Sequence, residues 1–175
     1  KLSNVDEEFV DTDLSLIVEN IQADFEVLIQ QKNAKLHIQK LPVIKAIPIQ
    51  MNQLFYNLMS NALKFTESIP EITVSYSEIT AEELRAYNLQ GDLKSKAYIK
   101  ITFVDNGVGF DQNYADQIFV IFQRLNDRSK FTGTGIGLAI CKKIVENHNG
   151  FITAFSKVNE GSTFNIFLPD EHRQI

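Results

Sequence analysis

The stretch FTGTGIGLAICKK, residues 131–143, places three alternating glycines directly before an apolar helical segment. Glycine adopts backbone conformations that other residues avoid, and the free N–H groups at the start of a helix attract anions. The pattern therefore predicts either a flexible turn or a turn whose amides hold a phosphate, and the rest of the chain has to decide between them.

The residues around these glycines exclude two common phosphate-binding folds. A P-loop requires Gly-x4-Gly-Lys-Ser/Thr, but Gly137 is followed by Leu138 and Ala139. A dinucleotide-binding fingerprint that starts at Gly133 would need glycine at position 138 and a strand before it, and FQRLNDRSKFT does not have the pattern of a strand. What remains is Gly133-Thr134-Gly135-Ile136-Gly137 at a helix N-terminus, preceded by a long loop.

Hydrophobic periodicity predicts the elements on either side of this turn. Strands are expected over residues 8–13, 34–40, 71–79, 97–105, 151–156 and 162–169. Helices are expected over 14–31, with Asp13 as N-cap, over 48–65 and over 135–147, with a short helical turn inside 80–96. The order lacks a strict βαβ rhythm, so it favours an α+β layered sandwich over a Rossmann-type sheet.

Composition limits the function. The 175 residues suit one domain, the net charge is −5 without a block of Lys or Arg, and Cys141 is the single cysteine. We therefore expect no nucleic-acid partner and a reducing, cytoplasmic environment. No apolar run is long enough to cross a bilayer and no signal peptide opens the chain, so we expect no direct membrane contact in this fragment, which can still be the cytoplasmic part of a membrane-bound sensor. Because the chain begins with Lys1, we expect it to be a piece of a longer protein.

Two further motifs carry candidate binding residues. The stretch FVDNGVGF, residues 103–110, ends a predicted strand with Asp105 and continues through Gly107 and Gly109. A carboxylate there can accept a hydrogen bond from an exocyclic amine while the glycines let the chain turn beside a flat ring; the alternative is a capping Asp in a strand-end turn.

The second motif lies on the predicted helix over 48–65. Asn57, Asn61 and Lys64 fall on one face, beside an apolar stripe. An amide oxygen can coordinate Mg²⁺, and an ammonium group can neutralise a phosphate. The alternative is a solvated edge of the helix.

Taken together, NLMSNALKFT, DNGVG, IFVIF, GTGIGLAI and GSTFNIFLP occur in an order that closely resembles the ATP-binding catalytic domain of sensor histidine kinases. This family shares its superfamily with gyrase-type ATPases. The resemblance covers about residues 9–169 and implies a Bergerat-type fold. In that fold a mixed, mostly antiparallel five-stranded sheet packs against three helices and carries a mobile ATP lid.

The resemblance assigns roles residue by residue. It implies that Asn61 binds Mg²⁺, that Asn57 and Lys64 lie at the phosphates, and that Asp105 takes the adenine amino group beside Gly107 and Gly109. Phe119 and Phe122 match the aromatic pair of the lid. The phosphate-binding turn is matched by Gly133, Thr134, Gly135, Gly137 and Leu138, and the polar pair that closes the pocket by Ser162 and Thr163.

The resemblance also favours a kinase over a hydrolase. Gyrase-like relatives carry a glutamate, which activates water, where this chain has Asn57. Catalytic candidates are therefore Asn57, Lys64 and the lid residue Arg124, with Arg128 as an alternative; either arginine can equally be a solvated charge. A non-catalytic module that senses ATP is the other open interpretation.

The phosphoacceptor is expected elsewhere. The family's reactive histidine lies in a helical hairpin and is followed by an acidic residue, a context that His37, His148 and His172 all lack. We therefore expect residues 1–7 to be the tail of a preceding hairpin or linker, 8–170 to be the catalytic domain and 171–175 to be a tail. The expected partners are the dimerisation and phosphoacceptor domain of the same full-length protein, which we expect to be a homodimer, and a response regulator.

Overall fold

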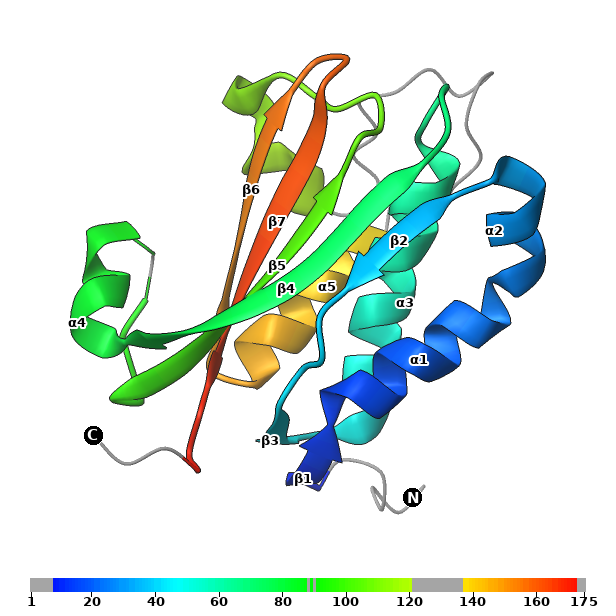
Figure 1. Ribbon diagram of the computed structural model, residues 1–175. Helices are drawn as coiled ribbons and strands as arrows, with labels where there is room; N and C mark the ends of the chain where they lie inside the picture. The colour runs from blue at the N-terminus through cyan, green and yellow to red at the C-terminus, as the bar shows by residue number, and fades with distance from the viewer. Residues whose placement is uncertain (1–7, 88, 90, 121–136, 173–175) are drawn as a thin grey trace, which may run out of the picture.

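The computed structural model describes residues 8–87, 89, 91–120 and 137–172. Its centre is a five-stranded sheet in the order β2-β4-β5-β7-β6 (Figure 1). The strands are β2 (Lys35–Ile38), β4 (Glu71–Thr80), β5 (Ala97–Asp105), β6 (Phe151–Lys157) and β7 (Gly161–Pro169). Only the β2–β4 pair is parallel, so the sheet is mixed and mostly antiparallel, as predicted.

Three long helical segments cover one face of the sheet (Figure 1). They are α1 (Leu14–Asp24), continued by α2 (Glu26–Lys32), then α3 (Pro48–Lys64) and α5 (Gly137–Asn147). The main core lies between these helices and the inward residues of the strands, including Ile101 and Phe103 of β5, both fully buried. The predicted two-layer α+β sandwich is confirmed.

The sequence around Pro48 explains where helix α3 begins. Pro48 occupies the first turn, where its missing N–H costs nothing, and Ile47 precedes it in an extended conformation. Its apolar stripe, which includes Leu54, Leu58 and Leu63, is buried against the sheet. The C-terminal end of the helix meets the loop that follows β5, because the Phe65 carbonyl accepts a hydrogen bond from the Val108 N–H at 2.8 Å.

The prediction of one helix over 14–31 is wrong in detail. The chain leaves helical geometry at Phe25, whose φ of −96° and ψ of 9° separate α1 from α2. The Phe25 side chain is buried, and its ring lies 4.8 Å from that of Tyr56 on α3. The expected N-cap is confirmed, because the Asp13 side chain accepts a hydrogen bond from the Leu16 N–H at 3.3 Å.

Sequence reasoning missed β3 (Val43–Ala46), which pairs with β1 (Val10–Asp13) in a separate two-stranded sheet. The strand predicted over 8–13 therefore exists from Val10 but lies outside the central sheet. A strand of four residues is too short for its alternation of apolar and polar side chains to be recognised. Its ladder hydrogen bonds come from β1, which is distant in the sequence.

The long connection 80–96 folds over the opposite face of the sheet. The predicted helical turn is α4 (Ala81–Leu84), extended by the 3₁₀ helix η1 (Arg85–Tyr87), and Thr80 accepts the predicted capping hydrogen bond from the Glu83 N–H. Two more 3₁₀ turns, η2 (Gln112–Tyr114) and η3 (Gln117–Phe119), follow β5. A second, smaller core forms under α4 from Ile79, Leu84, Tyr98 and Phe167.

Candidate functional site

Asp105 ends β5 directly opposite Ser162 of β7. Its carboxylate accepts a hydrogen bond from the Gly107 N–H at 2.8 Å. Burial raises the pKa of Asp105 to about 6, against the opposing effect of backbone N–H groups of Gly107 and Ser162. A half-buried carboxylate with this backbone support can accept a further hydrogen bond, and acceptance from an adenine amine stays a prediction.

The glycines beside Asp105 are required by close packing. A Cβ on Gly107 would lie 2.3 Å from the carbonyl oxygen of Phe65, and one on Gly109, whose φ is +66°, would lie 2.3 Å from that of Lys157. The Val108 N–H donates to the Phe65 carbonyl at 2.8 Å. The loop that follows Asp105 is therefore held directly against the C-terminal end of α3.

Asn106 is a functional candidate that sequence reasoning missed. Its side-chain Nδ2 donates to the Ile69 carbonyl at 2.9 Å, and its Oδ1 accepts from the Glu71 N–H at 2.7 Å. These two hydrogen bonds fix the loop that follows Asp105 to the segment between α3 and β4. The Asn-Gly dipeptide signalled only a turn, because the partners lie 35 and 37 residues away along the chain.

The polar face of α3 meets the start of α5. The Asn57 amide donates to the Gly137 carbonyl at 3.4 Å. Asn57 and Asn61 are half-buried, and Lys64 is exposed at the end of the helix. The structure therefore brings Asn57 next to the start of the helix predicted to bind phosphate, whereas the roles of Asn57, Asn61 and Lys64 toward phosphate and metal stay predictions.

The structure places the predicted residues Ser162 and Thr163 on opposite faces of the sheet and buries Phe119. Successive residues of a strand point to opposite faces, so Ser162 shares the face of Asp105 whereas Thr163 pairs with Val104 and Phe155 on the other face. Phe119 is buried in the core, and its ring packs edge-on against Phe164 of β7 at 6.4 Å. Contacts of Thr163 and Phe119 with a ligand stay predictions.

Of the other residues predicted for the lid and the phosphate-binding turn, the structure describes Gly137 and Leu138. Leu138 lies half-buried in the first turn of α5, beside Gly137. The others lie outside the described residues: Phe122, Arg124, Arg128, Gly133, Thr134 and Gly135. The described part of the chain contains no cluster of three or more His, Cys, Asp or Glu residues that could hold a metal ion, and Mg²⁺ binding by the Asn61 amide stays a prediction.

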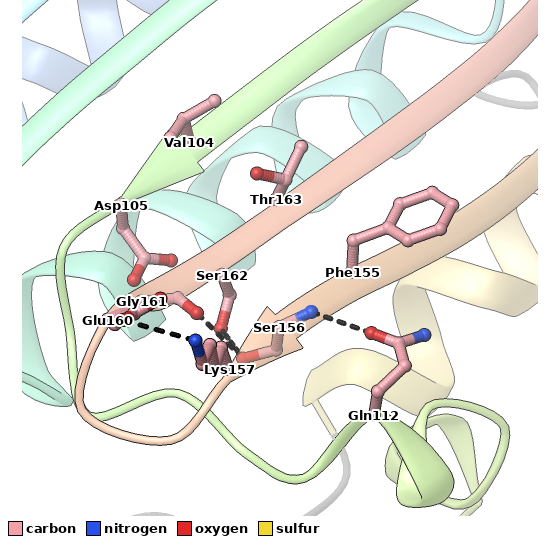
Figure 2. Close-up of a pocket in the computed structure, with 10 residues that line it drawn as sticks. All are labelled: Val104, Asp105, Gln112, Phe155, Ser156, Lys157, Glu160, Gly161, Ser162 and Thr163. Carbon is pink, nitrogen blue, oxygen red and sulfur yellow. Dashed lines mark hydrogen bonds and ion pairs between the residues drawn. The ribbon is translucent and has the colours of Figure 1, made fainter.

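A hollow at the end of β5, β6 and β7 borders Asp105 and is also lined by Val104, Phe155 and Thr163 of the opposite face (Figure 2). Gln112 and Ser156, which the sequence did not single out, line it together with Ser162. The Gln112 side chain accepts from the Ser156 N–H at 2.8 Å and donates to the Ala154 carbonyl at 3.1 Å, which satisfies the outer edge of β6. Ser156 thereby lies between the loop that follows Asp105 and the β6–β7 turn.

Comparison with known proteins agrees with this geometry. The family described as histidine kinase-, DNA gyrase B-, and HSP90-like ATPase matches residues 46–172, which include α3, the Asp105 loop, α5 and the last two strands. The chain belongs to this ATPase family.

Within the family, the similar proteins are histidine kinases and phytochromes. Phytochrome-like protein Cph1 of Synechocystis is 36% identical over 159 residues, which cover 90% of this chain and 19% of that protein. The circadian input-output histidine kinase CikA of Synechococcus elongatus is 37% identical over 134 residues, 75% of this chain and 16% of that protein. The chain thus spans under a fifth of the length of these relatives.

Solved structures share the fold at lower identity. The catalytic domain of histidine kinase ThkA, in a nucleotide-free form, has a TM-score of 0.71 and 22% identity over 93% of this chain and 96% of that one. Full-length ShkA in complex with AMPPNP has a TM-score of 0.71 and 19% identity over 94% of this chain and 32% of that one. No helix in the described residues is both long and apolar enough to span a bilayer.

Proposed function

We propose that this domain binds Mg-ATP and transfers the γ-phosphoryl group to a histidine in a separate phosphoacceptor domain of a two-component sensor kinase. Asp105 would accept the adenine amino group, Asn61 would ligate Mg²⁺, and Asn57 and Lys64 would lie at the phosphates. Gly133, Gly135, Gly137 and the lid residue Arg124 would complete the phosphate site.

The observation that favours transfer over hydrolysis is the composition of α3. The helix brings Asn57 into contact with α5 but contains neither Asp nor Glu along its whole length. Asn57 donates its amide to the Gly137 carbonyl, and an amide cannot serve as a general base toward water. A bound triphosphate would therefore be positioned and neutralised without an activated water beside it.

The acceptor would be supplied from outside this domain. Among its histidines, His148 is buried and bonded to backbone groups, and His37 and His172 each lie beside a carboxylate at the surface. We propose that the parent protein is a dimeric, cytoplasmic kinase whose helical hairpin supplies the reactive histidine and which passes the phosphoryl group to a response regulator.

Two measurements test this proposal. Calorimetry should show ATP binding that Mg²⁺ strengthens, and Asn61→Ala should remove the Mg²⁺-dependent part. Labelled ATP mixed with the domain alone should label nothing, whereas adding the parent protein's hairpin should label one histidine in proportion to domain concentration. Binding without transfer at high hairpin concentration would favour the ATP-sensing module, and fast steady hydrolysis would favour a gyrase-like ATPase.

A further inference from the structure

The Ser156 hydroxyl has three polar neighbours at the edge of the candidate site, of which Figure 2 draws Gly161 and Ser162. It accepts a hydrogen bond from the Phe110 N–H at 2.8 Å and donates to the Gly161 carbonyl at 2.7 Å. Its third neighbour is the Ser162 hydroxyl, 3.0 Å away. Ser156 therefore joins the loop that follows Asp105 to both the turn and the first residues of β7.

These contacts fix which serine donates. The Gly161 carbonyl has no hydrogen and can only accept, so it takes the single hydroxyl hydrogen of Ser156. The Ser156 oxygen keeps two lone pairs, one for the Phe110 N–H and one for the Ser162 hydroxyl. The Ser162 hydrogen is consequently directed at Ser156, and its oxygen is left as an acceptor toward other neighbours.

Ser162 lies directly opposite Asp105 in the sheet register and on the same face. A ring that enters this site would meet the Asp105 carboxylate and an acceptor-only hydroxyl together. An exocyclic amine has hydrogens for both acceptors, whereas a ring carbonyl at the same position would present lone pairs to lone pairs.

We propose that Ser156 is a positioning residue that sets the preference of this site for an amine over a carbonyl on the purine ring, by keeping the Ser162 hydroxyl in its acceptor orientation. The inference rests on the proposed nucleotide binding. It assigns the preference to a residue that does not itself touch the base, in addition to Asp105.

ADP and IDP form the sharpest pair of probes, because hypoxanthine replaces the amine of adenine with a carbonyl. Calorimetry on the 175-residue chain should show that the wild type prefers ADP. Ser156→Ala removes the acceptor of the Ser162 hydroxyl, which is then free to donate to a carbonyl. The ratio of the IDP and ADP dissociation constants should fall roughly three- to tenfold, the equivalent of about one hydrogen bond.

Three variants control this result. Ser156→Thr keeps a hydroxyl and should retain the wild-type ratio. Thr153→Val removes a buried hydroxyl of the same strand that has no hydrogen-bond partner among the described residues, so the ratio should not change. In a Ser162→Ala background, Ser156→Ala should no longer alter the ratio, because no hydroxyl remains to be reoriented.

The failures of the two proposals are distinct. If the wild-type chain binds neither nucleotide, the proposed function fails and this inference fails with it. If the wild type binds ADP and IDP equally, or if Ser156→Ala weakens both by the same factor, nucleotide binding stands and the role of Ser156 is purely structural. Should Ser156→Ala not fold, a ratio in Ser156→Thr that departs from the wild type by more than threefold would overturn the proposal.

Discussion

At the scale of single residues, the site depends on a carboxylate in an unfavourable place. Asp105 is half-buried at the end of β5, and burial raises the pKa of its side chain to about 6. Above that pH the folded domain holds a partly desolvated charge, supported by backbone N–H groups. An amine of a ligand would add a further hydrogen bond to this carboxylate. Burying the Asp105 charge lowers the stability of the unliganded domain, which is common for residues of a binding site.

We predict that Asp105→Asn stabilises the unliganded domain while it weakens ADP binding. The folded pKa of Asp105 lies above its unfolded value of 3.8, so the wild type loses stability as pH rises from about 4 to about 6. The variant lacks this titration. Its advantage in free energy of unfolding should be small at pH 4 and reach about 1–3 kcal/mol at pH 7, as urea denaturation would measure.

The same variant should lose roughly tenfold to a hundredfold in ADP affinity, because a charge-assisted hydrogen bond is worth about 1.5–3 kcal/mol. Unchanged affinity would remove Asp105 from the site.

At the scale of elements, the site is formed where the ends of several segments are tied together. The turn between β6 and β7 packs on Asp105: a Cβ on Gly161, whose φ is +104°, would lie 2.0 Å from the Asp105 carbonyl oxygen. The Asn159 N–H donates to the Val108 carbonyl at 2.7 Å. The turn and the loop therefore fix each other.

We predict that Gly161→Ala destabilises the domain by more than about 2 kcal/mol and lowers ADP affinity, because the methyl group would push the turn away from Asp105. Gly91→Ala is the matched control. Gly91 has a similar φ of +113°, but among the described residues a Cβ there would meet Phe151 alone, at 3.5 Å. Its cost should be limited to about 1 kcal/mol of backbone strain, with ADP affinity unchanged. If Gly161→Ala and Gly91→Ala had equal effects on thermal unfolding and on ADP affinity measured by calorimetry, the close packing of Gly161 on Asp105 would not matter for the site.

His148 joins three other elements at the opposite end of α3. Its Nε2 accepts from the Ile47 N–H at 3.0 Å, its Nδ1 lies 2.7 Å from the Ile144 carbonyl, and its ring packs edge-on against Phe9 just before β1. These bonds require the neutral ring with the hydrogen on Nδ1. Burial lowers the pKa of His148 below 6.5.

We predict that His148→Ala costs about 2–4 kcal/mol at pH 7.5, because it leaves the buried Ile47 N–H without a partner and opens a cavity. The unfolded chain takes up a proton near pH 6.5 that the folded domain resists, so the wild type loses this stabilisation as pH falls below about 6.5. The difference in free energy of unfolding should narrow between pH 7.5 and pH 5.5. His37→Ala, at an exposed ion pair with Glu71, should cost under about 1 kcal/mol at either pH.

At the scale of the whole molecule, the two faces of the sheet carry two separate hydrophobic cores. The helices and the candidate site lie on one side, while α4 and η1 cover a small core on the other. The two sides are separated by the sheet, and β4, β5, β6 and β7 contribute residues to the cores on both sides. Stability and ligand binding should therefore respond differently to substitutions on each side.

We predict that Leu84→Ala lowers the free energy of unfolding by about 2–4 kcal/mol and leaves ADP affinity within twofold of the wild type. Leu58→Ala is the comparison: this equally buried leucine lies beside Asn57 on α3, so it should lower both stability and affinity. Urea denaturation and calorimetry on the same samples would separate the two effects. A large loss of affinity in Leu84→Ala would show that the faces are coupled.

The sequence by itself determined the family and most of the elements. Long periodic segments such as those of α3, β4 and β5 are recognisable because burial repeats along them, and caps such as Asp13 act on neighbours a few residues away. The spacing of Asn57, Asn61 and Lys64 and the Asp105 motif are equally local, so they marked the candidate site in advance.

Only the tertiary structure decided how the site is held together. Strand β3, the break at Phe25, and the roles of Asn106, His148 and Ser156 depend on partners from distant parts of the chain, such as Ile47, which lies 101 residues from His148. The division of Ser162 and Thr163 between two faces likewise follows from strand register. A hydrogen bond or a close approach between distant residues leaves no pattern in a single sequence, because its strength depends on where the fold places both partners.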